Sequence, residues 1–271
     1  MGILNVTPDS FSDGGMFSNP ARAVAHGRAL AADGADIIDV GGESTRPHAE
    51  RVSVDDELKR VVPVVRDLST AGVPVSIDTM RAEVAEAAIE AGAVMVNDVS
   101  GGLADPNMPQ FLAQAGVPCV VMHWRAHSST MNRHAAYDDV VAEVVEELRQ
   151  RLDALVDVGV DPERIILDPG LGFSKTAEHN WALLANLDAM HAIGRPLLIG
   201  ASRKSFLGIA LATDEGLRSP HARDDATLAV SALAAAEGAY CVRVHNARST
   251  MDALHVAAAW RAARTASLNQ W

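Results

Sequence analysis

The chain has 271 residues and a formal net charge of −12, and 48% of its residues are hydrophobic but only 4% aromatic. Its length fits one α/β barrel of about 250 residues, with a core built mainly from Ala, Val, Leu and Ile. The negative charge argues against a nucleic-acid partner, which needs a basic face, but a few cations inside a cleft can still hold an anionic substrate.

The sequence carries no signal-peptide pattern and no apolar run near 18 residues, so we expect no association with a membrane. Cys119 and Cys241 each lie in an apolar run that is typical of a buried strand. We interpret both as buried free thiols, which fits a reducing, cytoplasmic location.

Short apolar runs alternate with amphipathic stretches along the whole chain. The apolar runs predict strands at residues 1–6, 36–40, 75–77, 95–96, 119–122, 165–167, 197–199 and 241–244. The stretches between them predict helices at residues 21–32, 54–70, 81–90, 107–114, 138–158, 177–191, 202–211 with 223–237, and 251–266. Eight such units with continuous Val/Ile/Leu strands favour a closed (β/α)8 barrel over an open doubly wound sheet. No linker or low-complexity tract divides the chain, so we predict a single domain over residues 1–271.

The segment after the first strand is too long to be a simple connector. It begins with LNVTPDSFSDGG and runs to about Asn19, whereas loops in α/β units usually have about two to six residues. Long loops of this kind are often functional, and this one mixes carboxylates and hydroxyls with a phenylalanine. The pattern predicts a segment that holds or covers a ligand.

Nearly every predicted strand ends in a polar or titratable residue. In a (β/α)8 barrel the carboxyl ends of all strands meet at one face, which carries the active site. The residues at these ends are Asn5, Asp39 with Glu43, Asp78, Asn97 with Asp98, His123, Asp168, Ser202 with Arg203 and Lys204, and Arg243 with His245. One such residue alone could be a strand-end cap, but the whole set indicates an active site.

The chemistry of this set describes its ligand. Carboxylates and amides suit a flat heterocycle edged with N–H donors, whereas cations suit a phosphate or a carboxylate. The first group is Asp78, Asn97 and Asp168; the second is Lys204 and Arg243, with Arg46 and His245 as further candidates. Asn5 could supply one oxygen to a Mg²⁺ ion that is already held by phosphates. The sequence lacks the GxGxxG, GxxxxGK[ST], HExxH and GxSxG motifs, so dinucleotide enzymes, P-loop enzymes, zincins and serine hydrolases have no support.

Seven motifs in chain order resemble those of the dihydropteroate synthase family, and of its actinobacterial members most closely. They are NVTPDSFSDGG, DVGGESTRP, SIDT, VNDVSGG, DPGLGF, GASRKSF and VRVH, and they cover essentially the whole chain. The resemblance implies a (β/α)8 barrel with long catalytic loops after strands 1 and 2. It also implies a transferase of folate biosynthesis that joins 6-hydroxymethyl-7,8-dihydropterin diphosphate to 4-aminobenzoate, giving 7,8-dihydropteroate and diphosphate. A homodimer and inhibition by sulfonamides are further implications.

Roles carried over from the family fall on matching positions of this chain. For the pterin they fall on Asp78, Asn97, Asp168 and Lys204, and for the diphosphate on Thr45, Arg46, Arg243 and His245. For 4-aminobenzoate they fall on Phe11, Pro47, Phe173, Lys204 and Ser205, and for Mg²⁺ on Asn5. The resemblance implies that Asp78, Lys204, Arg243 and His245 serve catalysis, by an SN1-like loss of diphosphate that Mg²⁺ assists.

Two residues depart from the family pattern. His48 stands where glycine commonly follows TRP, and Asn246 stands where aspartate usually follows RVH. We expect His123 and Trp124 to form a wall of the barrel mouth rather than a catalytic pair. Two alternatives are a methyltetrahydrofolate-binding barrel of a corrinoid-dependent methyltransferase and a non-catalytic pterin-binding paralogue. The long first loop argues against the former, and the presence of Asn5, Arg243 and His245 argues against the latter.

Overall fold

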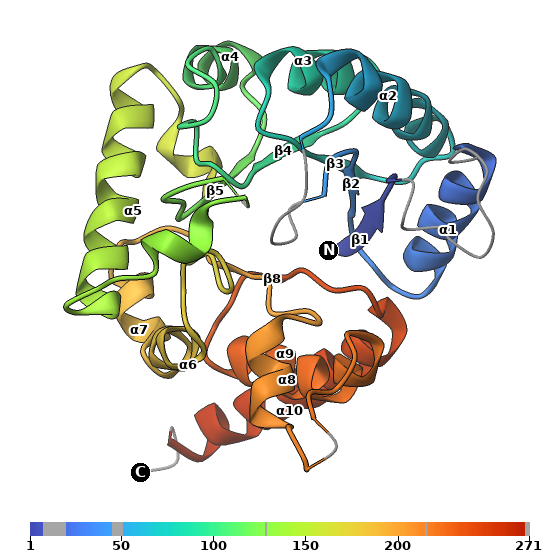
Figure 1. The fold of residues 1–271 in the computed structure, drawn as a ribbon. Helices are drawn as coiled ribbons and strands as arrows, with labels where there is room; N and C mark the ends of the chain where they lie inside the picture. The colour runs from blue at the N-terminus through green and yellow to red at the C-terminus, as the bar shows by residue number, and fades with distance from the viewer. Residues whose placement is uncertain (8–19, 45–50, 128, 215, 269–271) are drawn as a thin grey trace.

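The computed structural model describes residues 1–7, 20–44, 51–127, 129–214 and 216–268. Within them the chain forms eight parallel strands surrounded by helices (Figure 1). The strands are β1 (Gly2–Asn5), β2 (Ile38–Gly41), β3 (Val75–Asp78), β4 (Met95–Asp98), β5 (Cys119–Met122), β6 (Ile165–Asp168), β7 (Leu198–Ile199) and β8 (Cys241–Val242).

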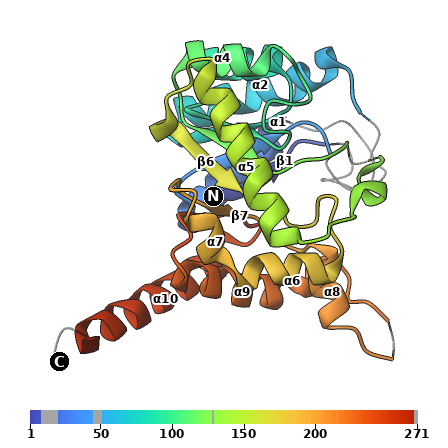
Figure 2. The ribbon, with the colours of Figure 1, turned by 90° about the vertical axis from the view of Figure 1, so that its left-hand side faces the viewer.

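The helices cover the outside of the strands. They are α1 (Pro20–Ala32), α2 (Val54–Thr70), α3 (Ala82–Glu90), α4 (Met108–Ala115), α5 (Val140–Asp157), α6 (Ala177–Ala185), α7 (Leu187–His191), α8 (Ser205–Ala210), α9 (Asp224–Ala236) and α10 (Ala247–Leu268). Short 3-10 turns occur at Met131–His134, Pro162–Arg164 and His221–Arg223. Figure 2 shows α10 running out beyond the barrel at its far end. Among the helices that the structure describes, none combines the length and the apolar character that a membrane crossing requires.

The strands close into a barrel. Strands β1 to β6 pair in sequence order, and β7 pairs with β8. A parallel bridge between Leu167 and Leu197 joins β6 to the β7 edge, and a bridge between Gly2 and Val244 joins β8 to β1. At the second junction, the Ile3 N–H donates to the Val244 carbonyl at 2.9 Å, and the Val244 N–H donates to the Met1 carbonyl at 3.0 Å. The predicted (β/α)8 barrel is therefore confirmed.

The two-residue period of the strands separates an apolar barrel floor from a polar mouth. Outward-facing residues such as Val40, Ile77 and Leu167 are fully buried against the helices. On the inner face, Met1, Val120, Ile166 and Leu198 pack together at the amino ends of the strands. Ile37 and Met95 pack against this floor, and two residues beyond Ile37, Met95 and Ile166 the same inner face carries Asp39, Asn97 and Asp168. The inner face of the barrel is therefore apolar at the amino ends of the strands and polar toward their carboxyl ends.

Several element boundaries differ from the sequence-based prediction for local reasons. The predicted helix at 177–191 breaks into α6 and α7 at Asn186, whose φ of −130° and ψ of 44° are not helical. The helix predicted from residue 202 begins at Ser205, because Arg203 takes a positive φ of 60°. The last helix begins at Ala247 rather than 251, because the Asn246 Oδ1 accepts a hydrogen bond from the Ser249 N–H at 3.2 Å, as an N-cap does. This bond also gives Asn246 a structural role where the family usually has aspartate.

Candidate active site

The structure places most of the predicted site residues at the carboxyl ends of the strands. Asn5, Asp78 and Asp168 are the last residues of β1, β3 and β6, and Asn97 is the penultimate residue of β4. Arg243 and His245 follow β8, and Lys204 and Ser205 lie at the start of α8. Phe173 lies in the loop after β6. Thr45, Arg46, Pro47, Phe11 and His48 lie outside the described residues.

Arg243 lies between two buried carboxylates. Its Nε donates to the Asp39 Oδ2 at 2.6 Å, and one terminal nitrogen donates to the Asp78 Oδ2 at 2.6 Å. The Asn97 Nδ2 donates to the same Asp39 oxygen at 2.8 Å. Four strands thus converge on one network, and the side chain of Arg243 remains 20% exposed on the mouth side. A fixed guanidinium at this place can meet an anion without first having to be ordered.

The network sets the ionisation of its members. Burial raises the pKa of Asp78 to about 7, and the Arg243 guanidinium opposes this shift, while Asp39 adds to it. Burial opposes the charge of Arg243, but the carboxylates of Asp39 and Asp78 outweigh it and raise the pKa of Arg243. Arg243 is therefore always cationic, whereas Asp78 can exchange a proton near neutral pH.

Asp168 lies on the other side of the mouth. Its Oδ1 accepts a hydrogen bond from the Gly170 N–H at 2.7 Å, and its side chain is buried. Burial raises the pKa of Asp168, and the nearby ammonium of Lys204 counteracts this rise. Beside it, Gly200 leaves space: a Cβ at that position would lie 3.7 Å from the Asp168 Oδ2. The Asp168 Oδ2 lies beside Gly200, and a carboxylate oxygen can accept hydrogen bonds from the N–H edge of a flat ligand.

Lys204 lies close to the Phe173 ring and within the electrostatic influence of Asp168. Its Nζ donates to the Leu171 carbonyl and lies 4.7 Å from the centroid of the Phe173 ring. Burial lowers the pKa of Lys204 to about 8, and the carboxylate of Asp168 counteracts this shift. The lysine stem packs against Gly172, where a Cβ would come within 2.9 Å of the Lys204 Cδ. The ammonium is thus a fixed cation between an acidic pocket and an aromatic ring.

His245 is oriented by Ser202. The hydroxyl of Ser202 lies 2.8 Å from the His245 Nδ1 and accepts a hydrogen bond from the backbone N–H of His245 at 3.3 Å. The Ser202 hydroxyl can donate its proton to Nδ1, and in that tautomer the ring carries its own proton at Nε2. His245 can then donate a hydrogen bond to an anion. The neighbouring Arg203 instead pairs with Asp224 at 2.6 Å and belongs to the framework.

The described residues fit a metal ion that is held largely by a substrate. Within the described ranges no three His, Cys, Asp or Glu side chains gather as a metal cluster. Asn5 is partly exposed at the end of β1, and its amide oxygen is the single hard ligand predicted there. Mg²⁺ commonly takes one or two protein oxygens and completes its shell with phosphate and water, so this arrangement suits it.

Sequence reasoning noted some important residues without giving them a role. Asp39 appeared only as one strand-end carboxylate, yet it is fully buried and joins Arg243 to Asn97. Ser202 and Lys175 were not assigned either. The signal that could have found Asp39 is its inward register on β2, where Asp39 pairs with Ser76 of β3.

Comparisons with known proteins agree with this geometry. The family model "Pterin binding enzyme" matches residues 1–245. The dihydropteroate synthase of Mycobacterium leprae is 55% identical over 262 residues, which span 96% of this chain and 92% of the relative. A crystal structure of Yersinia pestis dihydropteroate synthase in a sulfonamide drug complex has a TM-score of 0.90 and 38% identity, and the match covers 96% of this chain and 93% of that one. A structure of Xanthomonas albilineans dihydropteroate synthase with 4-aminobenzoic acid has a TM-score of 0.87 and 43% identity, over 97% and 92% of the two chains. The chain belongs to the pterin binding enzyme family and, within it, to the dihydropteroate synthases.

Proposed function

We propose that this chain joins 6-hydroxymethyl-7,8-dihydropterin diphosphate to 4-aminobenzoate and releases 7,8-dihydropteroate and diphosphate. The observation that carries the proposal is the arrangement of charges at the barrel mouth. Buried acceptors line its interior, and fixed cations stand at its rim, as a ring with N–H donors and an attached diphosphate require. The reaction is a group transfer of folate biosynthesis.

The pterin occupies the polar interior. Asp168 accepts the two N–H donors of the amino-pyrimidinone edge, and charge-assisted bonds of this type are worth about 1.5–3 kcal/mol each. Asn97 is held by Asp39 at 2.8 Å and offers its amide oxygen to the ring. Asp78 lies nearest to the reacting methylene in this assignment, and Lys204 covers the ring from the α8 side. These are the roles that the family resemblance implies, assigned to the side chains that the structure describes.

The diphosphate lies at the rim. Arg243 and His245 bind its oxygens, and Thr45 and Arg46 complete the grip from the second loop. Asn5 would serve as the protein ligand of a Mg²⁺ ion, which would supply positive charge against the leaving group. The C–O bond breaks with its electron pair on the diphosphate, and the methylene carbon becomes a resonance-stabilised cation. The aniline nitrogen captures this cation and loses one proton. The main catalytic demand on the chain is therefore electrostatic stabilisation of the departing anion.

The 4-aminobenzoate site lies beside Lys204. Phe173 supplies an aromatic wall, Ser205 is exposed at the start of α8, and the first two loops contribute Phe11 and Pro47. A sulfonamide presents the same aniline ring with a sulfonyl group in place of the carboxylate. We therefore expect sulfonamides to compete with 4-aminobenzoate for this site, since discrimination would need a repulsive element.

The test is a product assay with the purified chain, both substrates, and either Mg²⁺ or excess chelator. We expect dihydropteroate to form with Mg²⁺ and sulfamethoxazole to raise the KM for 4-aminobenzoate without lowering kcat. Methyltetrahydrofolate serves as the control ligand, because a methyltransferase barrel would bind it and would release no diphosphate. Absence of product, or purely noncompetitive inhibition, would contradict the proposal.

We also propose that the chain is a cytoplasmic homodimer. Leu233 of α9 and Val256 and Trp260 of α10 are 67%, 67% and 72% exposed, and α9 packs against α10. Apolar side chains on paired helices suit a self-complementary twofold contact. The free cysteines Cys119 and Cys241 fit a reducing compartment. Light scattering on the wild type and on Trp260→Glu tests the dimer, and we expect the substitution to weaken it.

A further inference from the structure

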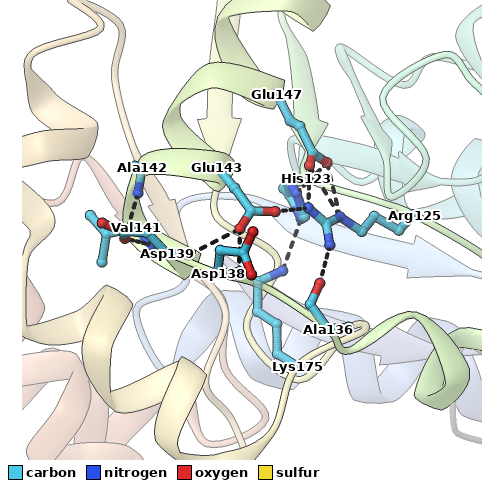
Figure 3. Close-up of polar contacts among 10 residues, drawn as sticks. All are labelled: His123, Arg125, Ala136, Asp138, Asp139, Val141, Ala142, Glu143, Glu147 and Lys175. Carbon is cyan, nitrogen blue, oxygen red and sulfur yellow. Dashed lines mark hydrogen bonds and ion pairs between the residues drawn. The ribbon is translucent and has the colours of Figure 1, made fainter.

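The proposed reaction leaves Lys175, a partly buried cation, without a role. Lys175 lies in the loop between β6 and α6, and its Nζ contacts His123 and the Phe173 carbonyl, of which Figure 3 shows the contact to His123. It donates to the Phe173 carbonyl at 3.1 Å, and it lies 2.9 Å from the His123 Nδ1. His123, which follows β5, is only 1% exposed. A partly buried lysine whose nearest partners are neutral groups needs an explanation, because withdrawing an unpaired charge from water is costly.

The orientation of His123 follows from its second partner. Its Nε2 lies 2.9 Å from the Glu147 Oε2, and Arg125 forms further bonds to both oxygens of that carboxylate. Partial burial alone would raise the pKa of Glu147, but the bonds from His123 and Arg125 hold it at about 2. Glu147 is therefore an acceptor only, and His123 must carry its proton at Nε2. The lone pair at Nδ1 then faces the ammonium of Lys175.

His123 stays neutral in this position. Burial lowers its pKa to about 4, and the charge of Lys175 adds to the shift. A chain of contacts thus runs from Arg125 through Glu147 and His123 to Lys175, and Figure 3 shows these four side chains pointing toward one another. The chain fixes the ammonium at one place and leaves its positive charge uncancelled by any direct carboxylate contact among the described residues.

The Lys175 ammonium influences a residue of each proposed substrate site, Asp168 for the pterin and Phe173 for 4-aminobenzoate. Burial lowers the pKa of Lys175, and among the carboxylates around it Asp168 opposes this shift most strongly. Lys175 in turn favours the ionised form of Asp168. The bond to the Phe173 carbonyl holds the loop that carries the aromatic wall. We propose that Lys175, held by His123 and Glu147, is a positioning residue that keeps Asp168 ionised for the pterin and fixes Phe173 for 4-aminobenzoate. The inference rests on the proposed function and deepens it.

The charged surroundings of Lys175 come from every element packed against it. Asp168 comes from β6, His123 and Arg125 from β5 and the segment after it, Glu147 from α5, and Lys204 from the segment between β7 and α8. The Tyr137 ring lies 6.0 Å from the ammonium. Burial lowers the pKa of Lys175 to about 7. Removal of its charge leaves Lys204, the Gly170 N–H and Arg243 to oppose the desolvation of Asp168, so the pKa of Asp168 should rise.

The test measures pterin affinity as a function of pH in the full chain. The probe is 6-hydroxymethylpterin, measured by calorimetry at pH 6.0, about one unit below the pKa of Lys175, and at pH 8.5, above the pKa values of both Lys175 and Lys204. For Lys175→Met we expect about tenfold weaker binding than wild type at pH 6.0, because loss of the ammonium raises the pKa of Asp168 and favours its protonated form at the lower pH. At pH 8.5 we expect a difference of less than about threefold, because the higher pH favours the carboxylate in both proteins. At each pH the affinity of the variant is divided by that of the wild type, which cancels the titration of the ligand itself.

A pair of His123 variants gives an independent readout. His123→Asn keeps an acceptor near the Nδ1 position and so retains the contact to Lys175, whereas His123→Gln keeps a donor near Nε2 and retains only Glu147. We expect the Asn variant to bind the pterin as the wild type does, and the Gln variant to lose affinity at pH 6.0 as Lys175→Met does. This pair decides the question even where Lys175→Met fails to fold.

The assignment is overturned if the ratio of the wild-type and Lys175→Met affinities for the pterin is the same at both pH values. It is also overturned if the two His123 variants bind the pterin equally well. Either result would leave Lys175 with a framework role. Failure of the proposed function looks different. In that case the wild type itself binds no pterin and forms no dihydropteroate, whatever the variants do. A wild type that binds pterin but forms no product would contradict the reaction and leave the pH comparison valid.

Discussion

Asp39→Asn should separate the binding role of the Arg243 network from its contribution to folding. Asp39 is fully buried, and its Oδ2 accepts bonds from the Arg243 Nε at 2.6 Å and the Asn97 Nδ2 at 2.8 Å. An amide oxygen can accept both bonds, but without the charge, so each should weaken by about 1 kcal/mol. The new NH2 group then takes the place of Oδ1, which has no hydrogen-bond partner within the described residues. A buried donor without an acceptor costs about 1–3 kcal/mol.

The two effects together predict a loss of about 3–5 kcal/mol in the free energy of unfolding. Arg243 keeps its bond to Asp78 at 2.6 Å, so the substitution does not leave the guanidinium unpaired. A less firmly held Arg243 should lower kcat/KM for the pterin diphosphate by about 10- to 100-fold, since a factor of ten corresponds to about 1.4 kcal/mol. Urea denaturation and steady-state kinetics measure the two quantities.

Asp98→Asn is the matched control. Asp98 is equally buried at the end of β4, but among the described residues its oxygens accept bonds from Ser100 and Gly102 and none from Arg243. We expect this variant to lose stability while its kcat/KM falls by less than about threefold. If Asp39→Asn and Asp98→Asn lose stability alike and keep kcat/KM alike, the reasoning about Asp39 is refuted.

Three further predictions concern single residues of the mouth. Asp168→Asn should weaken pterin binding at least about tenfold in calorimetry, because one acceptor oxygen becomes a donor facing donors; unchanged affinity would contradict the assignment. Asn5→Ala should raise the Mg²⁺ concentration needed for half-maximal activity while the thermal midpoint stays unchanged, and an equal requirement in both proteins would leave Asn5 as a strand-end cap. Burial raises the pKa of Asp78 from 3.8 to about 7, so the folded state binds this proton more tightly than the unfolded state does. The resulting stabilisation of the fold is fully present below pH 3.8 and is lost as the pH rises to about 7. Asp78→Asn should remove this contribution in urea titrations, and an unchanged slope between pH 4 and 7 would show that other groups cause it.

The fold and the main site residues could be predicted because both follow from strand period and strand order. A parallel barrel brings all strand ends to one face, so Asp78, Asn97 and Asp168 had to lie near one another whatever their partners were. The register then directs alternate residues inward, which also places Arg243 above the apolar floor. These features need no knowledge of individual contacts.

Other features depend on contacts that no local pattern contains. Arg243 and Asp39 are 204 residues apart in the sequence, and their bond depends on the closure of β8 against β1. His123 was expected to form a wall of the barrel mouth. Its two ring nitrogens instead connect Glu147 of α5 to Lys175 of the following βα unit. The sequence showed the residue types but could not show which side chains would meet across the helix layer.

The balance of charges in the mouth accounts for the order of events in the proposed reaction. The described mouth contains three inward carboxylates and three cations, namely Asp39, Asp78, Asp168, Arg243, Lys204 and Lys175. Before the substrate binds, Arg243 pairs with Asp39 and Asp78, so the strongest cation of the mouth already has carboxylate partners. The diphosphate then draws on Arg243 and His245, which weakens the hold of Arg243 on Asp78. When the diphosphate leaves with its electron pair, the new cation faces a carboxylate that has just lost part of its partner. Stabilisation of the cation therefore increases as the anion departs, which favours bond breaking before attack by the aniline nitrogen.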